Sequence, residues 1–300
     1  MTKSFKLYPI SQPLIFRVSG RDATRYLHGR VTQNIKAMKE GEALETLILT
    51  PQGKVQGRLW CKREENSYLF LSTAANETVE SLLRFKVADD VVVEIVENLA
   101  ALQILESSEI VEGSLDSLTN EISSVEIFKS SWGEASCYIL LLPEKELPKL
   151  AANTALELAS SEDREWLRIS QLIPEMQRDL SEDISAPEIP LTNLVSFNKG
   201  CYAGQELVEM ATARGRPNRK LIGLAINLEL YPAAKTLKQG AAIQVINEAG
   251  AVVEKPVGYL SSLIAAPDGH TLRALGFIKS STPDDSQLAV ENIPAELFSR

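Results

Sequence analysis

The last third of the chain is a series of short apolar runs separated by turn residues. The runs KLIGLAINLEL, AAIQVI, VVEKPVGYLSSLIA and TLRALGFIK are divided by Gly, Pro and Asn. Strands of this length at this spacing are typical of a small barrel, in which closure of the sheet leaves no strand edge open. Residues 217–300 are therefore predicted to form a separate C-terminal β-barrel domain.

The first two thirds of the chain mix strands and helices without a strict strand–helix–strand rhythm, which favours an α+β fold over a doubly wound one. Apolar alternation predicts a strand at 13–20 and three more within 45–72, the latter broken by the turn chemistry of 51–53 and 65–67. A short helix is predicted at 20–29, with a stop at its terminal glycine.

The middle of the chain has the pattern of strands gathered around two helices. Val79, Leu82 and Leu83 are spaced three and four apart, which predicts an amphipathic helix over 74–87. The other elements predicted here are strands at 90–97 and 101–106, an exposed acidic loop at 107–124, a hairpin at 125–142 turning at Trp132-Gly133, and a helix at 144–158. We interpret this region as one ferredoxin-like unit.

A further helix is predicted over 160–174, because Ser161 can cap its start and two acidic residues follow in the first turn. The chain from 174 to 197 is irregular and rich in proline and acidic residues.

Composition limits the classes of function. With 31 basic and 40 acidic residues the net charge is −9, which argues against a dedicated, non-specific nucleic-acid binder. We find no signal-peptide pattern and no apolar stretch long enough to span a bilayer, so no membrane association is expected. The three cysteines are far apart and form no CxxC pair, which indicates a reducing cytoplasm. A chain of 300 residues suits two or three domains.

The two histidines, His28 and His270, belong to no zinc-binding or phosphate-loop motif. A hydrogen-bonded structural role is the simpler interpretation of both, and no metal site is predicted.

One segment, NKGCYAGQELVEMATARG (198–215), combines chemistry with a helix start. With Asn198 as a candidate N-cap and a helix from about Ala203 to Ala213, Cys201 would lie near the positive end of a helix dipole and two residues from Lys199. Both features favour the thiolate over the thiol. The alternative is that Cys201 is a small buried apolar residue packed under the helix.

The run from Lys199 to Glu206 resembles the K-G-C-[FY]-x-G-Q-E signature of the YgfZ-type folate-binding proteins, relatives of the T-protein (aminomethyltransferase) of the glycine cleavage system. The segments 20–35, 48–55 and 166–175 also resemble that family, in the family's order, so the resemblance covers nearly the whole chain.

The resemblance implies an α+β, three-domain, cloverleaf-like fold around a channel that holds tetrahydrofolate or another folate derivative. The implied domains are a discontinuous folate-binding domain (1–48 and 160–216), a ferredoxin-like domain (49–159) and the C-terminal β-barrel (217–300). It further implies a role in making or maintaining iron–sulfur enzymes, including those that modify tRNA. The partners would then be these enzymes or their assembly proteins, and we expect a monomer.

The family's functional residue is the signature cysteine, here Cys201, with Lys199 beside it. The other candidates are polar or aromatic groups for the ligand. They are Thr32, Gln33, Asn34, Trp166, Arg168, Tyr202, Gln205, Glu206 and Arg214.

Arg214 belongs to the cationic run ARGRPNRK (213–220), which could bind folate carboxylates, an acidic partner surface or tRNA phosphate, or could be a solvated connector. Trp166 could stack on a pterin or be a core aromatic.

Two departures from the T-protein pattern count against aminomethyl transfer. T-proteins carry an acidic residue that assists transfer just after a glycine turn, whereas residues 53–58 contain none. In the T-protein R-x-E-x-G-x-P segment the glutamate contacts the pterin; here Ser170 stands at that position, and Leu172 replaces the glycine.

Three hypotheses remain open. The first is a folate-binding accessory protein whose Cys201 either ligates iron transiently or forms a mixed disulfide. The second is a folate-dependent one-carbon transferase of the aminomethyl type. The third is a non-catalytic scaffold that docks a protein or tRNA.

Overall fold

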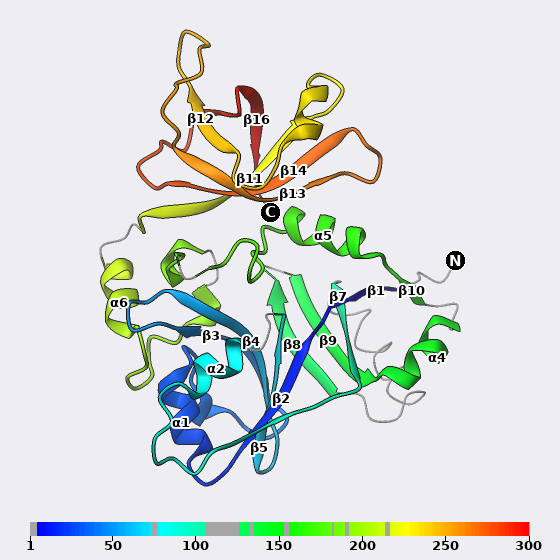
Figure 1. Cartoon of the computed structure of the whole chain (residues 1–300), viewed down its shortest axis with the longest axis vertical. Helices are drawn as coiled ribbons and strands as arrows, with labels where there is room; N and C mark the ends of the chain where they lie inside the picture. Colours follow the sequence, from blue (N-terminus) through cyan, green and yellow to red (C-terminus); the bar gives the residue numbers. More distant parts are fainter. Residues whose placement is uncertain are drawn as a thin grey trace. The chain divides into compact units, whose positions relative to one another are not determined.

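The structure is a computed structural model of the chain (Figure 1). It describes residues 5–73, 77–105, 126–132, 135–152, 156–181, 183–189, 192–213 and 217–299. The chain divides into two compact units. Unit 1 comprises Met1–Ser161 and Asn193–Gln205, and unit 2 comprises Glu162–Thr192 and Glu206–Arg300. Each unit has a hydrophobic core of its own.

The first sheet of unit 1 is antiparallel and has the strand order β3-β4-β5-β2-β6. Phe16 of β2 stacks on Phe70 of β5, with ring centroids 5.1 Å apart. Helices α1 and α2 add Leu27 and Leu82 to the same core. The elements are β2 (Leu14–Ser19), α1 (Ala23–Arg30), η1 (Ile35–Ala37), β3 (Ala43–Leu49), β4 (Val55–Arg63), β5 (Ser67–Ser72), α2 (Glu77–Leu83) and β6 (Val92–Ile95).

The second sheet of unit 1 has the order β10-β1-β7-β9-β8, in which only the β1–β10 pair is parallel among the described pairings. Leu7, Leu102, Leu140 and Leu150 form its core. The elements are β1 (Phe5–Pro9), β7 (Leu99–Leu105), β8 (Glu126–Trp132), β9 (Ala135–Pro143), η2 (Glu144–Glu146), α4 (Leu147–Ala152) and β10 (Leu156–Leu158).

Several predicted elements are confirmed with altered bounds. The hairpin predicted at 125–142 is the β8–β9 pair, and the helix predicted over 74–87 is the shorter α2. The helix predicted over 144–158 was too long: α4 ends at Ala152, and 156–158 form β10 instead. The reason is tertiary, because Leu156 and Leu158 pair with Phe5 and Leu7 of β1. The loop predicted at 107–124 lies outside the described residues.

The predicted domain boundary between residues 48 and 49 does not coincide with a break in the structure. It falls at the end of β3, which pairs with β4 from Ala43–Lys62 to Leu49–Val55. The strands of the predicted ferredoxin-like unit also divide, since β4, β5 and β6 join the first sheet and β7, β8 and β9 the second. The turn residues at 51–53 make a hairpin within one sheet, because the two apolar strands that flank them pair with each other, with one register shift beside the turn between Ile48 and Leu49.

Unit 2 contains the predicted C-terminal barrel, which is confirmed as a closed barrel with the order β11-β14-β13-β12-β15-β16 (Figure 1). Pairing of β11 with both β14 and β16 closes it, and Leu224, Leu260 and Leu288 lie in its core. The elements that lie in unit 2 or begin at one of its boundaries with unit 1 are α5 (Ser161–Ser170), η3 (Ala186–Glu188), η4 (Thr192–Leu194), α6 (Gln205–Ala213), β11 (Arg219–Asn227), η5 (Pro232–Thr236), β12 (Ala242–Ile246), β13 (Gly258–Ala265), β14 (Thr271–Lys279), β15 (Gln287–Val290) and β16 (Ile293–Phe298).

A buried ion network fixes α5 to the barrel within unit 2. The fully buried guanidinium of Arg168 donates to Glu165, to Asp179 and to Ser262 of β13. Ser262 donates in turn to Asp179 at 2.7 Å. Burial opposes the charged guanidinium, but its hydrogen bonds to Glu165 and the nearby carboxylates raise its pKa.

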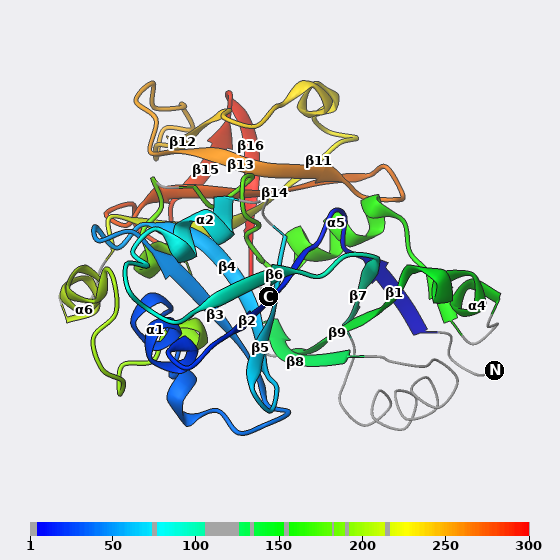
Figure 2. The same ribbon diagram turned by 60° about the horizontal axis from the view of Figure 1, so that its bottom comes forward.

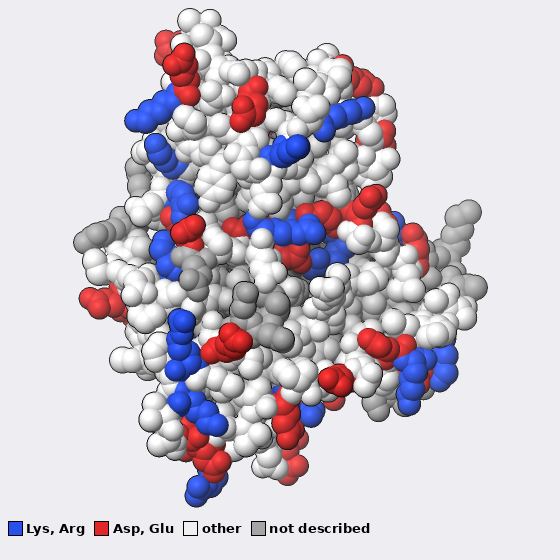
Figure 3. All heavy atoms as spheres, in the orientation of Figure 1, with Lys and Arg blue, Asp and Glu red and all other residues white. Residues whose placement is uncertain are grey.

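The surface carries mixed charge. Figure 3 shows basic and acidic side chains interspersed over the face in view, with no large field of one sign. Among the helices that the structure describes, none is both long and apolar enough to cross a bilayer.

Candidate functional site

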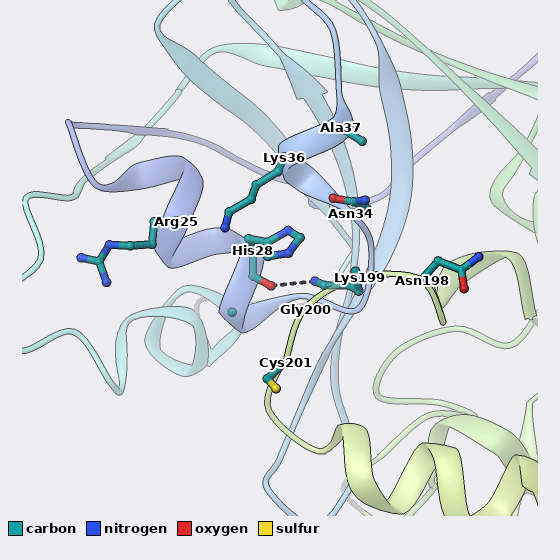
Figure 4. A pocket seen from close by; sticks show the side chains of 10 residues that line it. Arg25, His28, Asn34, Lys36, Ala37, Asn198, Lys199, Gly200 and Cys201 are labelled. Carbon is teal, nitrogen blue, oxygen red and sulfur yellow. Dashed lines mark hydrogen bonds between the residues drawn. The ribbon is translucent and has the colours of Figure 1, made fainter.

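The signature segment runs alongside the C-terminal end of α1, within unit 1 (Figure 4). Figures 1 and 2 both show α1 beside the β3–β4 hairpin. The backbone N–H of Ala203 donates to the carbonyl of Gly29 at 3.2 Å, and that of Ser196 donates to the carbonyl of Thr32 at 3.0 Å. The tertiary fold therefore brings together two segments, 28–34 and 196–203, that the sequence separates widely.

Lys199 joins these two segments. Its Nζ donates to the carbonyls of His28 (2.6 Å), Val31 (2.6 Å) and Gln33 (2.8 Å). An ammonium has three N–H donors, so these three carbonyls match it completely. The contacts fall at the C-terminal end of α1, where the helix dipole favours a positive charge.

Burial lowers the pKa of Lys199 to about 7, and the positive charge of Lys36 acts in the same direction. The three carbonyls oppose this change, because only the protonated ammonium can donate to all of them. The ammonium predicted to stabilise a Cys201 thiolate is thus bonded to backbone oxygens. In this geometry Lys199 is a positioning residue for the loop that carries Cys201.

Gly204 sets the turn between this loop and α6. Its φ is +82°, and an added Cβ would lie 2.5 Å from the carbonyl oxygen of Thr50 and 3.0 Å from Cα of Gly53. The glycine of the signature is therefore required for a close approach to the β3–β4 turn as well as for its backbone conformation.

The thiol of Cys201 is exposed, whereas Cys61 and Cys137 are fully buried. The packing alternative for Cys201 is therefore wrong. Helix α6 begins at Gln205, later than the predicted start near Ala203, and Asn198 lies outside the helix and is not its cap. The side-chain oxygen of Gln205 instead accepts a hydrogen bond from the backbone N–H of Tyr202 at 3.2 Å. Cys201 is presented by an anchored loop that precedes the helix.

An open pocket of about 620 Å³ adjoins this loop. Its walls come from α1, from the segment around η1 and from the signature. The lining residues are Arg25, His28, Gly29, Asn34, Lys36, Ala37, Asn198, Lys199, Gly200 and Cys201, all of unit 1. The pocket is therefore lined by basic and neutral residues, with a thiol on its wall.

Of the three loop residues predicted after α1, Thr32 and Gln33 have structural partners. Thr32 is fully buried and donates to the carbonyl of Leu194 at 2.6 Å, while the side-chain amide of Gln33 donates to the carbonyl of Asn193. Asn34 lines the pocket. Their roles in ligand binding stay predictions.

The predicted ligand residues of the signature itself also differ in how far they are buried. Tyr202 is buried, with the Nζ of Lys199 5.0 Å from its ring centroid, and Glu206 is exposed in the first turn of α6. Arg214 lies outside the described residues.

The predicted folate contacts on α5 belong to unit 2. All five N–H groups of Arg168 point to internal acceptors, the fifth being the carbonyl of Ile173 at 2.7 Å, so the guanidinium has no donor left for a ligand. Trp166 is partly buried, and the guanidinium carbon of Arg273 lies 4.8 Å from its ring centroid. The prediction that these residues bind folate stays a prediction.

Two positions depart from the T-protein pattern, and the structure shows an unusual feature at each of them. They are Ser170 and Leu172. The hydroxyl of Ser170 is buried and has no hydrogen-bond partner among the described residues. Leu172 has a φ of +52°, a conformation that glycine adopts without strain. The backbone at this position thus keeps the shape of a glycine turn although the side chain has changed.

Sequence reasoning missed His28 and Lys36 as pocket residues. His28 is 8% exposed, and its Nδ1 has no hydrogen-bond partner among the residues described. Position was the available signal, because His28 stands near the end of the predicted helix and Lys36 follows in the loop after it, but the absence of a catalytic motif directed the interpretation of His28 toward a structural histidine. Within the described ranges, no three His, Cys, Asp or Glu side chains gather as a metal site.

Comparison with known proteins finds YgfZ proteins among the sequence relatives and a glycine cleavage T-protein among the solved structures of similar fold. No protein-family model matches the chain. It is 24% identical over 242 residues to the tRNA-modifying protein YgfZ of Yersinia pestis, covering 72% of this chain and 70% of the relative. It is 27% identical over 224 residues to the YgfZ protein of Colwellia psychrerythraea, covering 71% and 69%.

A chloroplast protein of Arabidopsis thaliana, "Putative transferase At1g60990, chloroplastic", is 25% identical over 294 residues. The match covers 88% of this chain but only 62% of the plant protein. Among solved structures, the glycine cleavage system aminomethyltransferase T of Bartonella henselae matches with a TM-score of 0.77 at 17% identity, over 99% of this chain and 86% of that one. Sequence relatives and fold therefore agree with the resemblance: the chain is similar in sequence to YgfZ proteins and has the fold of the glycine cleavage T-protein.

Proposed function

We propose that this protein is a folate-binding accessory factor whose Cys201 thiol acts on iron–sulfur enzymes, including enzymes that modify tRNA. The observation that carries the proposal is the exposed thiol of Cys201 on a loop anchored by Lys199. Two relatives are named tRNA-modifying proteins, and the fold is that of an aminomethyltransferase, which supports the tRNA and folate parts of the proposal.

Tetrahydrofolate would be held in part by α5. The buried hydroxyl of Ser170 lacks a partner among the described residues, and it stands where T-proteins place a pterin-contacting glutamate. A buried polar group without a partner costs free energy, which a ligand hydrogen bond would recover. Trp166 would supply an aromatic face. Arg168 would support the helix from within, because its donors are already used.

The thiol has two chemical options on a client protein. It can bind iron as a thiolate during cluster assembly, or it can attack a disulfide of the client and form a mixed disulfide, with the second client sulfur leaving as a thiolate. Both options require a thiol that another protein can reach, and among the three cysteines Cys201 meets this requirement.

A one-carbon transferase is the second candidate, because one relative is named as a transferase. The β3–β4 hairpin counts against it. Residues 53–58 supply no carboxylate, and Glu45 on the facing strand is buried in an ion pair with Arg58. An acid already committed to a buried guanidinium is a poor group for assisting transfer.

Folate binding is tested by titrating the protein with tetrahydrofolate, following tryptophan fluorescence and confirming the affinity by calorimetry. We expect saturable micromolar binding that is weakened by Trp166→Ala and by Ser170→Ala. Absence of binding at millimolar ligand would remove the folate part of the proposal. Turnover of a folate-borne one-carbon unit with an amine substrate would favour the transferase.

The thiol is tested in cells that lack the protein. Wild type is expected to restore iron–sulfur enzyme activity and tRNA modification, and Cys201→Ala at equal protein level is expected to fail. Lys39→Ala, at an exposed lysine outside the pocket, serves as the matched control and should behave as wild type. Full restoration by Cys201→Ala would contradict a role for the thiol.

A further inference from the structure

The pocket beside Cys201 is strongly basic although the whole chain is acidic. Four of its lining residues, Arg25, His28, Lys36 and Lys199, are basic, and none of the described residues that line it is Asp or Glu. The chain as a whole has a net charge of −9. A hollow lined by one sign of charge in a protein of the opposite sign concentrates counter-ions.

The basic groups are not equally available to a ligand. Arg25 is paired with Asp22 and Asp89, and its side chain points away from His28 in Figure 4. Lys199 donates to three carbonyls but is paired with no carboxylate that the structure describes. Lys36 is exposed, forms no ion pair within the described part of the chain, and extends toward His28 (Figure 4).

Two polar groups in the wall are left without partners. His28 is more than nine-tenths buried and its Nδ1 has no partner among the described residues. Asn34 is only partly buried as a residue, but its Oδ1 is buried and also lacks a partner among them. Such groups in a native protein require an explanation, and a bound ligand is one. The amide of Asn34 can present either its oxygen or its NH₂ by a half-turn, so it suits a ligand that accepts hydrogen bonds.

The positive charges in the wall repel one another. Burial lowers the pKa of His28, and the charges of Lys199 and Lys36 lower it further. Lys36 also lowers the pKa of Lys199. An anion between these groups would reverse both effects, because a negative charge favours the protonated forms of His28 and Lys199.

We propose that this pocket binds the phosphate or carboxylate group of a small anionic molecule against Lys36, His28 and Asn34, and thereby places that molecule beside the Cys201 thiol. The volume of about 620 Å³ exceeds the space that a bare phosphate needs and suits a small metabolite. The role of a ligand held beside the Cys201 thiol rests on the proposed function, which it makes more specific. The existence of the anion site does not depend on the proposed function.

The anion site is tested by proton NMR of the histidine ring signals, in Cys201→Ala protein so that thiol chemistry plays no part. The chain has only two histidines, and His270, in unit 2 and ion-paired with Glu229, is an internal control. At constant ionic strength, inorganic phosphate is expected to raise the pKa of His28 by about 0.5 to 1 pH unit while leaving His270 in place. Succinate in a parallel titration shows whether a carboxylate serves as well as a phosphate.

Lys36→Ala is expected to abolish most of the phosphate-induced rise in the pKa of His28, whereas Lys39→Ala is expected to preserve this rise. If His28 does not respond to millimolar phosphate or succinate, or responds equally in Lys36→Ala protein, the anion site does not exist. If only a short RNA moves the His28 signal, the ligand is a nucleic acid and the small-molecule proposal is wrong. Neither result depends on folate binding, so failure of this proposal and failure of the proposed function are distinguishable.

The position of the ligand beside the thiol is tested by the rate of Cys201 modification. Ellman's reagent carries two carboxylates, and a neutral disulfide reagent of similar size serves for comparison. Lys36→Ala is expected to slow the anionic reagent about three- to tenfold and to leave the neutral reagent unchanged. Equal effects on both reagents would place the anion away from Cys201.

Discussion

The ammonium of Lys199 donates a 2.6 Å hydrogen bond to the carbonyl of His28, a residue 171 positions earlier in the chain. With its bonds to Val31 and Gln33, this contact holds the signature loop against the end of α1. The lysine of the K-G-C motif therefore has a structural task that fixes where Cys201 lies. This relationship accounts for the lysine and the cysteine of the signature without requiring that the ammonium touch the thiol.

Replacing Lys199 by methionine should destabilise unit 1. Three carbonyls lose a charged donor while remaining partly buried, which costs about 2–3 kcal/mol in the free energy of unfolding. Urea unfolding measures the loss, and Lys39→Met, at an exposed lysine outside the pocket, should cost almost nothing. Equal stability of Lys199→Met and wild type would show that the carbonyl contacts contribute little.

The three thiols should react in two classes. Cys201 is exposed, whereas Cys61 and Cys137 are fully buried, and burial raises the pKa of Cys61 well above its ordinary value. Native protein should therefore consume one equivalent of a thiol reagent quickly, and denatured protein three. Cys201→Ser should show no fast phase; a fast phase that persists would mean that unit 1 opens readily.

Arg168 should be among the most sensitive positions in unit 2. Its removal leaves the buried Asp179 and the largely buried Glu165 without their main positive partner, so Arg168→Met should cost about 3–5 kcal/mol. Arg178 also contacts Glu165, but its side chain is 56% exposed, and Arg178→Met should cost less than about 1 kcal/mol. Denaturant unfolding of the two variants gives the comparison, and similar losses would contradict the assigned roles.

The same network predicts that the free energy of unfolding depends on pH. Burial opposes ionisation of Glu165, but the hydrogen bond and charge of Arg168 outweigh it and lower the pKa of this carboxyl below its ordinary value of 4.5. Because the folded pKa is the lower one, the stabilisation is present above about pH 4.5 and is lost as the pH falls through the folded pKa. The stability difference between wild type and Arg168→Met should therefore narrow in acid, and a constant difference down to low pH would exclude this linkage.

Gly204 and Gly200 offer a matched pair. In Gly204→Ala the new Cβ meets the Thr50 carbonyl oxygen at 2.5 Å and the residue is held at a φ of +82°, so we expect a loss of about 1–3 kcal/mol and a displaced Cys201 loop. In Gly200→Ala the nearest atom is Nε2 of His28 at 3.6 Å, an ordinary contact, and the change should be tolerated. Thermal unfolding together with the rate of Cys201 modification measures both effects.

Much of the local structure followed from the sequence. Period-two apolar runs predicted the strands of the barrel and the β8–β9 hairpin, because alternation fixes which face of a strand is buried. The eight-residue signature by itself points to the segment that carries Cys201. Widely spaced cysteines without a pairing pattern agree with three free thiols.

The tertiary structure decided what depends on residues far apart in sequence. Pairing with β1 turned 156–158 from predicted helix into strand, and pairing of β3 with β4 removed the predicted boundary after residue 48. Because the signature loop packs against α1, Lys199 can donate hydrogen bonds to three backbone carbonyls. The same packing places His28 and Lys36 in the wall of the pocket beside Cys201. A sequence pattern records local preference, whereas these contacts depend on which distant surfaces pack together, and that choice is made only when the whole chain folds.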